Sequence, residues 1–306
     1  MSGRAMLMRR VLLGALLLAL APGGGGRAAL RDEPERPPPW GDRWEPPRPP
    51  EPPELRAPVD AAAFAADCND DGTVRVVNDL EVRGGSGTLF ADCRVEVADA
   101  ATLSLIDVSL AGSYAFEMQS GAAGRLLVTD SYLTLFTRIG IGGHDGAAVA
   151  IRRSELSSMA GGAIEILLTG PGARIELSDS MMMSDGATSI DVSPRADGGR
   201  IEVRNSTLAA GSMAASALIL AASLGGVAGE AVVRESHLIG TASIAIETGT
   251  QGRTEVRDCS IETAGEVRIA AGDGGQCEAT GNDPDLICPP PAEGESTAVT
   301  TGVSGG

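Results

Sequence analysis

The chain contains no lysine, and its 306 residues include only two histidines, two tyrosines and two tryptophans. Without lysine, neither Schiff-base chemistry nor the phosphate-binding lysine of a P-loop is available. Positive charge is scarce: from Asp60 onward, 15 arginines face 34 acidic residues, a formal net charge of −19. Such a surface repels nucleic-acid phosphates and anionic lipid headgroups. We therefore expect no nucleic-acid partner.

Residues 1–28 have the pattern of a secretory signal peptide. Residues 1–10 carry three arginines, residues 11–21 are apolar, and small residues follow up to Ala28, after which we expect cleavage. The apolar run is shorter than the roughly 20 residues that span a bilayer. The sequence thus predicts a secreted, periplasmic or cell-surface protein without a membrane span in the mature chain.

Proline and small residues mark two further segments outside the body. Residues 29–58 are proline-rich and predict a disordered, extended linker, with a ligand for a proline-reading partner as the alternative. Residues 289–306 include "STAVTTGVSGG" and predict a disordered tail. The remaining residues, 59–288, have the size of a single all-β domain.

Six short phrases within this body align in one column, at steps of 23, 26, 26, 30 and 23 residues. They are "RLLVTDSYL", "AVAIRRSEL", "RIELSDSMM", "RIEVRNSTL", "EAVVRESHL" and "RTEVRDCSI". The column holds Ser131, Ser154, Ser180, Ser206, Ser236 and Cys259, and Cys93 and Val108 extend it upstream less cleanly. A period in the twenties with variable insertions indicates a solenoid.

Each phrase alternates between apolar and charged residues, which predicts a strand with one buried face. On the outer face, glutamates four residues before the column lie between arginines six and two residues before it. Stacked coils lie about 4.8 Å apart, so glutamates between two arginine columns offset the repulsion of like charges. We expect the small serine side chains to point inward at a bend and to form a stack of hydroxyls.

This pattern predicts an all-β fold: a right-handed parallel β-helix solenoid of about 8–10 coils. A left-handed helix is disfavoured because its hexapeptide repeat is absent. The coil pattern of residues 70–275 resembles that of the pectin-lyase-like superfamily, without a catalytic signature of that family. A short helix over "AAAFAAD" (61–67) is expected to cap the first coil, and the segment 277–288 to close a loop at the last.

The five cysteines predict two disulfides and one free thiol. Cys68 lies 25 residues before Cys93, close to one coil, so we expect these two to be bonded as stacked neighbours. Cys277 and Cys288 are expected to form the second pair. Cys259 replaces a serine of the inner column and is expected to be a buried free thiol.

One segment has half of a calcium-binding pattern. In "DCNDDGTV", Asp67, Asn69 and Asp71 alternate before Gly72, as in the first half of an EF-hand loop. The twelfth position is Asn78 in place of the bidentate glutamate. Calcium is therefore the one possible cofactor that the sequence suggests. The alternative interpretation of this segment is a capping turn before the next strand.

A glycan-binding patch is the other candidate site. Sugar sites favour aromatic platforms, and every aromatic residue of this chain lies before position 137. Tyr132 follows the column and faces outward, and Glu155 is its neighbour one coil later. With Tyr114 and His144 they form the predicted ligand-binding set, with edge packing by loops as the alternative.

The resemblance also implies a possible activity, the cleavage of polysaccharides. The hydrolases of that superfamily use motifs of the "NTD", "DD", "GHG" and "RIK" types, whereas this chain has only "DD" at Asp70 and Asp71 and "GGHDG" around His144. Its lyases bind polyuronates through calcium and basic residues, and a body of charge −19 repels such a polyanion unless calcium bridges the two. We therefore expect a non-catalytic, monomeric surface protein with a glycan or an envelope protein as partner. A polysaccharide lyase or glycoside hydrolase is the alternative.

Overall fold

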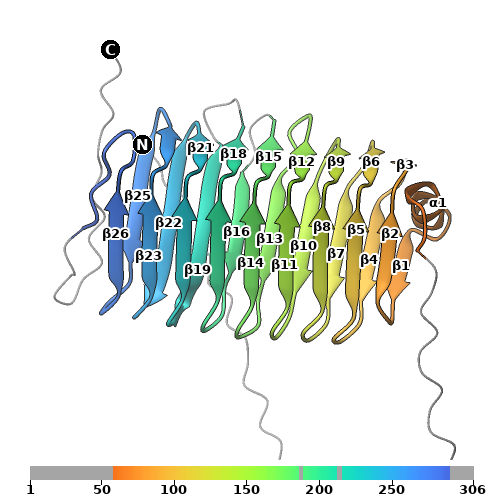
Figure 1. Ribbon diagram of the computed structural model, residues 1–306, viewed down its shortest axis with the longest axis horizontal. Coiled ribbons are helices and arrows are strands. Elements are labelled where there is room, and N and C mark those ends of the chain that lie inside the picture. The colour runs from red at the N-terminus through yellow and green to blue at the C-terminus, as the bar shows by residue number, and fades with distance from the viewer. Residues whose placement is uncertain (1–57, 186–188, 212–215, 290–306) are drawn as a thin grey trace, which may run out of the picture. The chain divides into compact units, whose positions relative to one another are not determined.

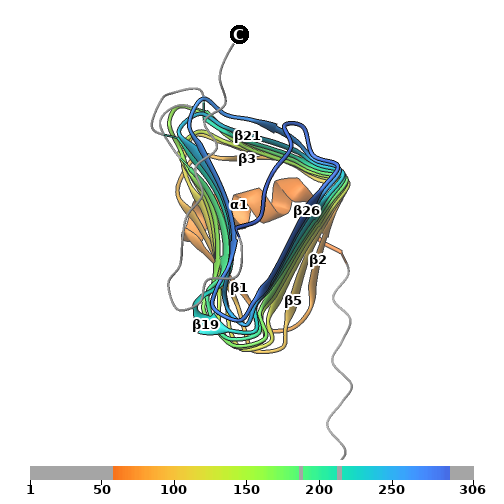
Figure 2. The ribbon, with the colours of Figure 1, turned by 90° about the vertical axis from the view of Figure 1, so that its left-hand side faces the viewer.

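The computed structural model describes residues 58–185, 189–211 and 216–289, and these form a parallel β-solenoid of about nine coils (Figure 1). The expected signal peptide (1–28), nearly all of the linker (29–58) and nearly all of the tail (289–306) lie outside the described residues. Seen from the C-terminal end, the chain passes counter-clockwise through three sheets while advancing toward the viewer (Figure 2). The solenoid is therefore right-handed, as the sequence predicts.

Each of the first eight coils contributes one strand to each of three parallel sheets, and the ninth contributes one strand each to sheets 1 and 2 among the described residues. Sheet 1 consists of β1 (Thr73–Val76), β4 (Cys93–Val97), β7 (Phe116–Ser120), β10 (Ile139–Gly143), β13 (Ile164–Leu168), β16 (Ile190–Pro194), β19 (Ala217–Val227), β22 (Ser243–Thr250) and β25 (Glu266–Ala271). Sheet 2 consists of β2 (Leu80–Arg83), β5 (Thr102–Ile106), β8 (Arg125–Thr129), β11 (Ala148–Arg152), β14 (Arg174–Ser178), β17 (Arg200–Arg204), β20 (Glu230–Arg234), β23 (Arg253–Arg257) and β26 (Gln276–Thr280). Sheet 3 consists of β3 (Ser86–Leu89), β6 (Ser109–Gly112), β9 (Tyr132–Leu135), β12 (Glu155–Ser158), β15 (Met181–Ser184), β18 (Thr207–Ala210), β21 (His237–Gly240) and β24 (Ser260–Glu262).

The core is a narrow apolar column inside the three sheets. In β14, for example, Ile175 and Leu177 point inward and are 1% exposed, whereas Arg174 and Glu176 face solvent. Complete burial of such a side chain contributes about 1.5–3 kcal/mol. Because the side-chain period of a strand is two, the alternation in each phrase decides which face is buried.

The serine column lies at the corner between sheets 2 and 3. The residue before each column position has a positive φ, and most of these residues are aspartate or asparagine: Asp107, Asp130, Arg153, Asp179, Asn205, Glu235 and Asp258. Asparagine and aspartate tolerate this left-handed conformation better than most residues. The single left-handed residue turns the chain, and the next side chain then points inward.

Hydrogen bonds link the serines from coil to coil. The hydroxyl of Ser180 accepts the backbone N–H of Ser154 one coil earlier at 3.2 Å and donates to the carbonyl of Ser178 at 2.7 Å. The same pair of contacts recurs at Ser154 and Ser206. The column thus satisfies buried backbone donors from coil to coil, as the expected hydroxyl stack requires.

One member of the expected column lies elsewhere. Val108 belongs to it, because its N–H donates to the hydroxyl of Ser131 at 3.2 Å. Cys93 instead begins β4 in sheet 1, where it pairs with Phe116. Cys93 lies only 15 residues before Val108, whereas neighbouring coils here are 23 residues apart, so Cys93 falls on another side of the coil.

Both ends of the solenoid are covered. Helix α1 (Ala61–Asp71) lies across the first coil (Figure 2). Phe64 and Cys68 are buried, and Cys68 is bonded to Cys93. At the last coil, Cys277 is bonded to Cys288. The buried Asn282 accepts the N–H of Cys259 at 3.0 Å there and so takes the place of a further column residue. Both disulfides are the pairs that the spacing predicts, although Cys68 lies on the cap helix and not in a stacked strand.

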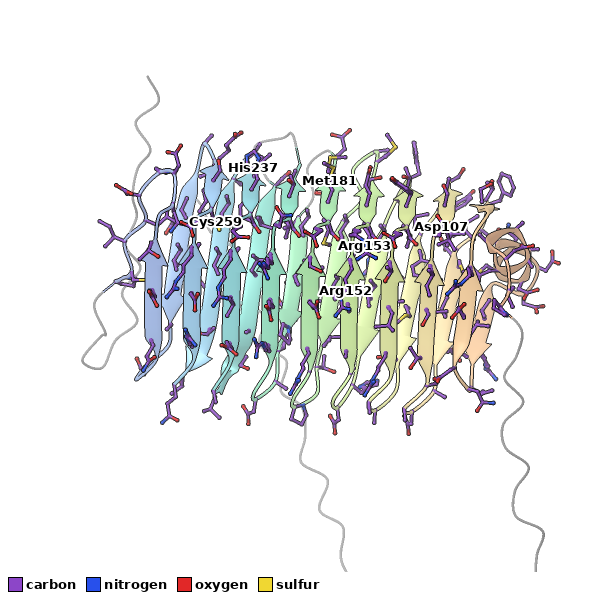
Figure 3. The ribbon with its side chains drawn as sticks, viewed as in Figure 1. Asp107, Arg152, Arg153, Met181, His237 and Cys259 are labelled. Atoms are coloured by element: carbon purple, nitrogen blue, oxygen red, sulfur yellow. A yellow bond between two sulfur atoms is a disulfide. The ribbon has the colours of Figure 1, made fainter. Side chains whose placement is uncertain are left out.

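Sheet 2 carries the expected columns of charge. Arg152 contacts Glu176 at 2.8 Å and Arg257 contacts Glu278 at 2.6 Å, each across one coil (Figure 3 labels Arg152). Glu255, in the glutamate column, is completely buried beneath arginine side chains. Alternating signs therefore stabilise a face that the sequence marks as highly charged.

Candidate functional site

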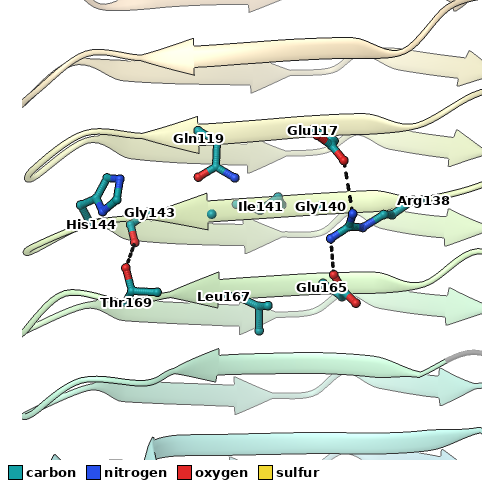
Figure 4. Close-up of a pocket in the computed structure, with 11 residues that line it drawn as sticks. Glu117, Gln119, Arg138, Gly140, Ile141, Gly143, His144, Glu165, Leu167 and Thr169 are labelled. Atoms are coloured by element: carbon teal, nitrogen blue, oxygen red, sulfur yellow. Dashed lines mark hydrogen bonds and ion pairs between the residues drawn. The ribbon is translucent and has the colours of Figure 1, made fainter. Parts of the chain in front are cut away.

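Two glycines interrupt the outer face of sheet 1. In β10, "IGIGG", Ile139 and Ile141 point into the core, so Gly140 and Gly142 occupy the outward positions. On the neighbouring strands these positions hold Glu117 and Gln119 in β7 and Glu165 and Leu167 in β13. The missing side chains leave a notch of about 330 Å³ between the two rows (Figure 4). We call it the glycine notch.

Arg138 closes one end of the glycine notch. It precedes β10 and reaches both flanking carboxylates, Glu117 at 3.3 Å between Nη1 and Oε1, and Glu165 through Nη2 (Figure 4). These three side chains are one-third to one-half exposed. The guanidinium fixes both carboxylates in position and leaves oxygens on each as hydrogen-bond acceptors.

His144, Gln119 and Thr169 lie toward the other end. A Cβ built on Gly142 would lie 2.3 Å from the side-chain oxygen of Gln119, so this amide lies over the glycine. The hydroxyl of Thr169 donates to the carbonyl of Gly143 at 3.1 Å, and His144 follows β10 directly (Figure 4). The notch therefore offers an amide, a hydroxyl, an imidazole, a guanidinium and two carboxylates over a floor of glycine backbone, with Leu167 beside it.

This arrangement suits the recognition of a polyhydroxylated ligand. The notch runs along β10, which extends about 16 Å at the rise of a parallel strand. Planar polar side chains with fixed orientation recognise sugar hydroxyls by hydrogen bonds.

Tyr132 and Glu155, two of the four residues expected to bind a ligand, are direct neighbours. They pair across adjacent coils on the outer face of sheet 3, and Tyr132 is 58% exposed. Both line a second, more open pocket of about 400 Å³ at the corner between sheets 2 and 3, which we call the corner pocket. Its other lining residues are Arg153, Ser154, Asp179, Ser180, Met181, Asn205 and Thr207.

The other two expected residues lie apart from this pair. Tyr114 is at the corner between sheets 3 and 1, two residues before β7, and is 50% exposed. His144 is at the corner between sheets 1 and 2, where it lines the glycine notch. The structure therefore divides the predicted set of four among three places on the solenoid.

The residues of the calcium pattern belong to helix α1. Asp67 and Asp71 are exposed on its last turns, and Asn69 donates to the carbonyl of Thr88 at 2.7 Å and accepts the N–H of Phe90 at 2.8 Å. The amide of Asn69 thus binds the chain after β3. Among the described residues, no three His, Cys, Asp or Glu side chains come together as a metal site. Asp70 lies on the same helix, at coil 1, whereas His144 lies at coil 4.

Sequence reasoning missed Gly140, Gly142 and Arg138. The signal was present: two glycines alternate with two isoleucines in the middle of a strand, where glycine is unfavourable unless something approaches the backbone closely. Glycine is neither clearly apolar nor charged, so it does not interrupt an alternation of apolar and charged residues. The two positions were therefore not recognised from the pattern.

Comparison with models of protein families, with curated proteins and with solved structures finds no match to this chain. Within the part of the chain that the structure describes, no helix is long and apolar enough to cross a membrane. The parallel β-solenoid is thus established by the chain's own geometry.

Proposed function

We propose that the protein is an exported, non-catalytic β-helix that binds a glycan in the glycine notch. The observation that carries this proposal is the pair Gly140 and Gly142, which opens a notch lined by hydrogen-bonding side chains on an otherwise filled sheet face. The affinity with the pectin-lyase-like superfamily belongs to the same proposal and is supported by the right-handed parallel coils.

Export is supported by two independent features. Residues 1–28 have the charge and apolar pattern of a signal peptide. The body contains two disulfides, which form and persist outside the reducing cytosol. Placement at the cell surface or in the periplasm would bring the solenoid into contact with envelope glycans.

The absence of catalysis is supported by the pairing of the two acids beside the notch. Glu117 and Glu165 both contact Arg138, so each carboxylate is already held in an ion pair. The candidates Asp70 and Asp71 lie on the cap helix, three coils from His144. These positions give no convergent acid and base.

A variant that fills the notch provides the test. Gly140→Thr adds a branched side chain at a position where a Cβ meets nothing closer than 3.4 Å. The fold should tolerate it, because glycine in a strand is less favourable than most residues by about 0.5–1 kcal/mol. Ala148→Thr, at an outward position of β11 in the same coil, is the matched control.

Mature wild-type protein and both variants would be applied to a glycan array with and without calcium, and release of reducing ends or unsaturated products would be followed in the same wells. We expect binding without product by the wild type and Ala148→Thr, and loss of binding by Gly140→Thr. Product release would overturn the non-catalytic part and favour a lyase or hydrolase. No binding by any form would reject a glycan ligand and favour a protein partner.

A further inference from the structure

Glu155 is a solitary charge on a face of small and uncharged side chains. The outward positions of β3, β6, β9 and β18 hold only serine, threonine, alanine and tyrosine. Apart from Tyr132, the only other ionisable side chains that face outward in the described strands of sheet 3 are His237 and Glu262. These two pair at 3.1 Å near the C-terminal end of the sheet. Within the described residues, no cation lies within ion-pair distance of Glu155.

A ring and a thioether stand on either side of this carboxylate. Glu155 pairs with Tyr132 on one neighbouring strand and with Met181 on the other. Their side chains therefore flank Glu155 at the spacing of adjacent strands, about 4.8 Å. Tyr132 is 58% and Met181 is 37% exposed, so both present apolar surface to a ligand (Figure 3 labels Met181).

The rim of the corner pocket adds a second carboxylate and a guanidinium. Asp179 accepts a hydrogen bond from the amide of Asn205 at 2.6 Å, which leaves other lone pairs of its carboxylate available. The guanidinium of Arg153 is turned to the previous coil, where it contacts both oxygens of Asp130 at 2.7 and 2.8 Å. The pocket thus has two carboxylates and a guanidinium that is already paired.

We propose that the corner pocket binds an organic cation, an ammonium or guanidinium group, against Glu155 between Tyr132 and Met181. The carboxylate accepts its N–H groups, the tyrosine ring attracts it by a cation–π interaction, and the polarisable thioether packs against its apolar substituents. The net negative charge of the body raises the local concentration of any cation. The group can belong to a free amine or to a basic side chain of a partner protein.

The scarcity of tyrosine gives a specific probe for this site. Tyr132 and Tyr114 are the only tyrosines, so ring-labelled tyrosine yields two sets of NMR signals. The full mature chain would be titrated at constant ionic strength with tetramethylammonium, arginine methyl ester, and acetylated and amidated tripeptides with a central lysine or arginine. We expect saturable shifts of Tyr132 and none of Tyr114. Tighter binding of the tripeptides would indicate a protein partner, and tighter binding of the free cations a small amine.

Two charge-matched variants separate a specific site from general attraction. Glu155→Gln should weaken binding about tenfold, as expected for loss of a charge-assisted contact of about 1.4 kcal/mol. Glu266→Gln, at an exposed position of β25, removes the same charge from sheet 1 and should leave the affinity unchanged. Equal effects of the two variants, undiminished binding by Glu155→Gln, or equal shifts of both tyrosines would overturn the proposal.

Discussion

The guanidinium of Arg153 contacts the carboxylate of Asp130 through two hydrogen bonds, Nε to Oδ1 at 2.7 Å and Nη2 to Oδ2 at 2.8 Å. The two residues occupy equivalent positions on adjacent coils, and both have the left-handed backbone conformation of that corner. The hydrogen bond from Arg153 lowers the pKa of the Asp130 carboxyl below its ordinary value. This pair therefore joins two coils on the outside of the corner, where the serine hydroxyls join them on the inside.

Arg153→Gln should make the free energy of unfolding depend less on pH in the acid range. A carboxyl whose pKa is lowered in the folded state stabilises the protein above its unfolded pKa, about 3.9, and this stabilisation is lost as the pH falls through the folded pKa. The difference in free energy of unfolding between wild type and variant should thus be present at pH 7 and vanish in strong acid. Urea unfolding at several pH values would measure it. Arg125→Gln, which loses a charge that has no ion pair among the described residues, should show no such pH dependence.

Glu255→Gln should destabilise the protein strongly. Glu255 is completely buried and contacts Arg234, Arg253 and Arg257 at 2.7, 2.7 and 3.1 Å. The three arginine side chains are 39–49% exposed and stay solvated, so the expected cost is that of lost hydrogen bonds to a buried carboxylate, about 1.5–3 kcal/mol. Chemical denaturation would measure the change in free energy of unfolding.

Glu202→Gln is the matched control for that prediction, because Glu202 stands in the same column but is 39% exposed and pairs with Arg200 at 3.1 Å. An exposed pair contributes at most about 1 kcal/mol. Similar losses in both variants would show that the burial of Glu255 has no energetic consequence.

Ser180→Ala should lower the free energy of unfolding, and the size of the loss measures how much one serine of the column stabilises the fold. The change leaves the buried N–H of Ser154 without its acceptor, at an expected cost of about 1–3 kcal/mol. Amide exchange at Ser154 should accelerate in the same variant. Ser180→Cys is the control, because Cys259 already occupies an equivalent position, and it should lose less. Unchanged exchange at Ser154 in Ser180→Ala would contradict this interpretation.

The thiol of Cys259 should react slowly in the folded protein. Its residue is 2% exposed, and burial raises the pKa of the thiol above its ordinary value. Because the thiolate is the reactive form, alkylation by iodoacetamide at pH 8 should be far slower in the native state than in non-reducing urea. Mass spectrometry with both disulfides intact would follow the label. Rapid native labelling would place Cys259 at an accessible position.

The sequence is sufficient to predict the solenoid because alternation and column register are local properties. Ile175 and Leu177 face inward for the same reason that Arg174 and Glu176 face outward, and every phrase repeats this alternation. The corner residue before each serine follows from the same alignment. The described coils differ from this expectation mainly at Cys93, which lies less than one coil before Val108 and therefore falls in sheet 1.

The site could be predicted only in part, because it depends on where each residue falls around a coil. Tyr132 and Glu155 are separated by one whole coil and so are neighbours on adjacent strands. Tyr132 and His144 are separated by about half a coil, which places them on different sides of the solenoid. The glycine notch forms because Gly140 and Gly142 have no side chains, whereas sequence motifs are defined by the side chains that are present.

The two disulfides lie near the two ends of the solenoid, where the terminal coil has one neighbour instead of two. Strands throughout the solenoid pair only with the coils before and after them, so an interior coil can loosen only by breaking two interfaces and an end coil by breaking one. Cys68–Cys93 joins the cap helix covalently to the second coil, past the first, and Cys277–Cys288 joins the last coil to the segment that covers it. Fraying from either end, the easiest route by which such a rod opens to proteases, is therefore blocked at its starting points.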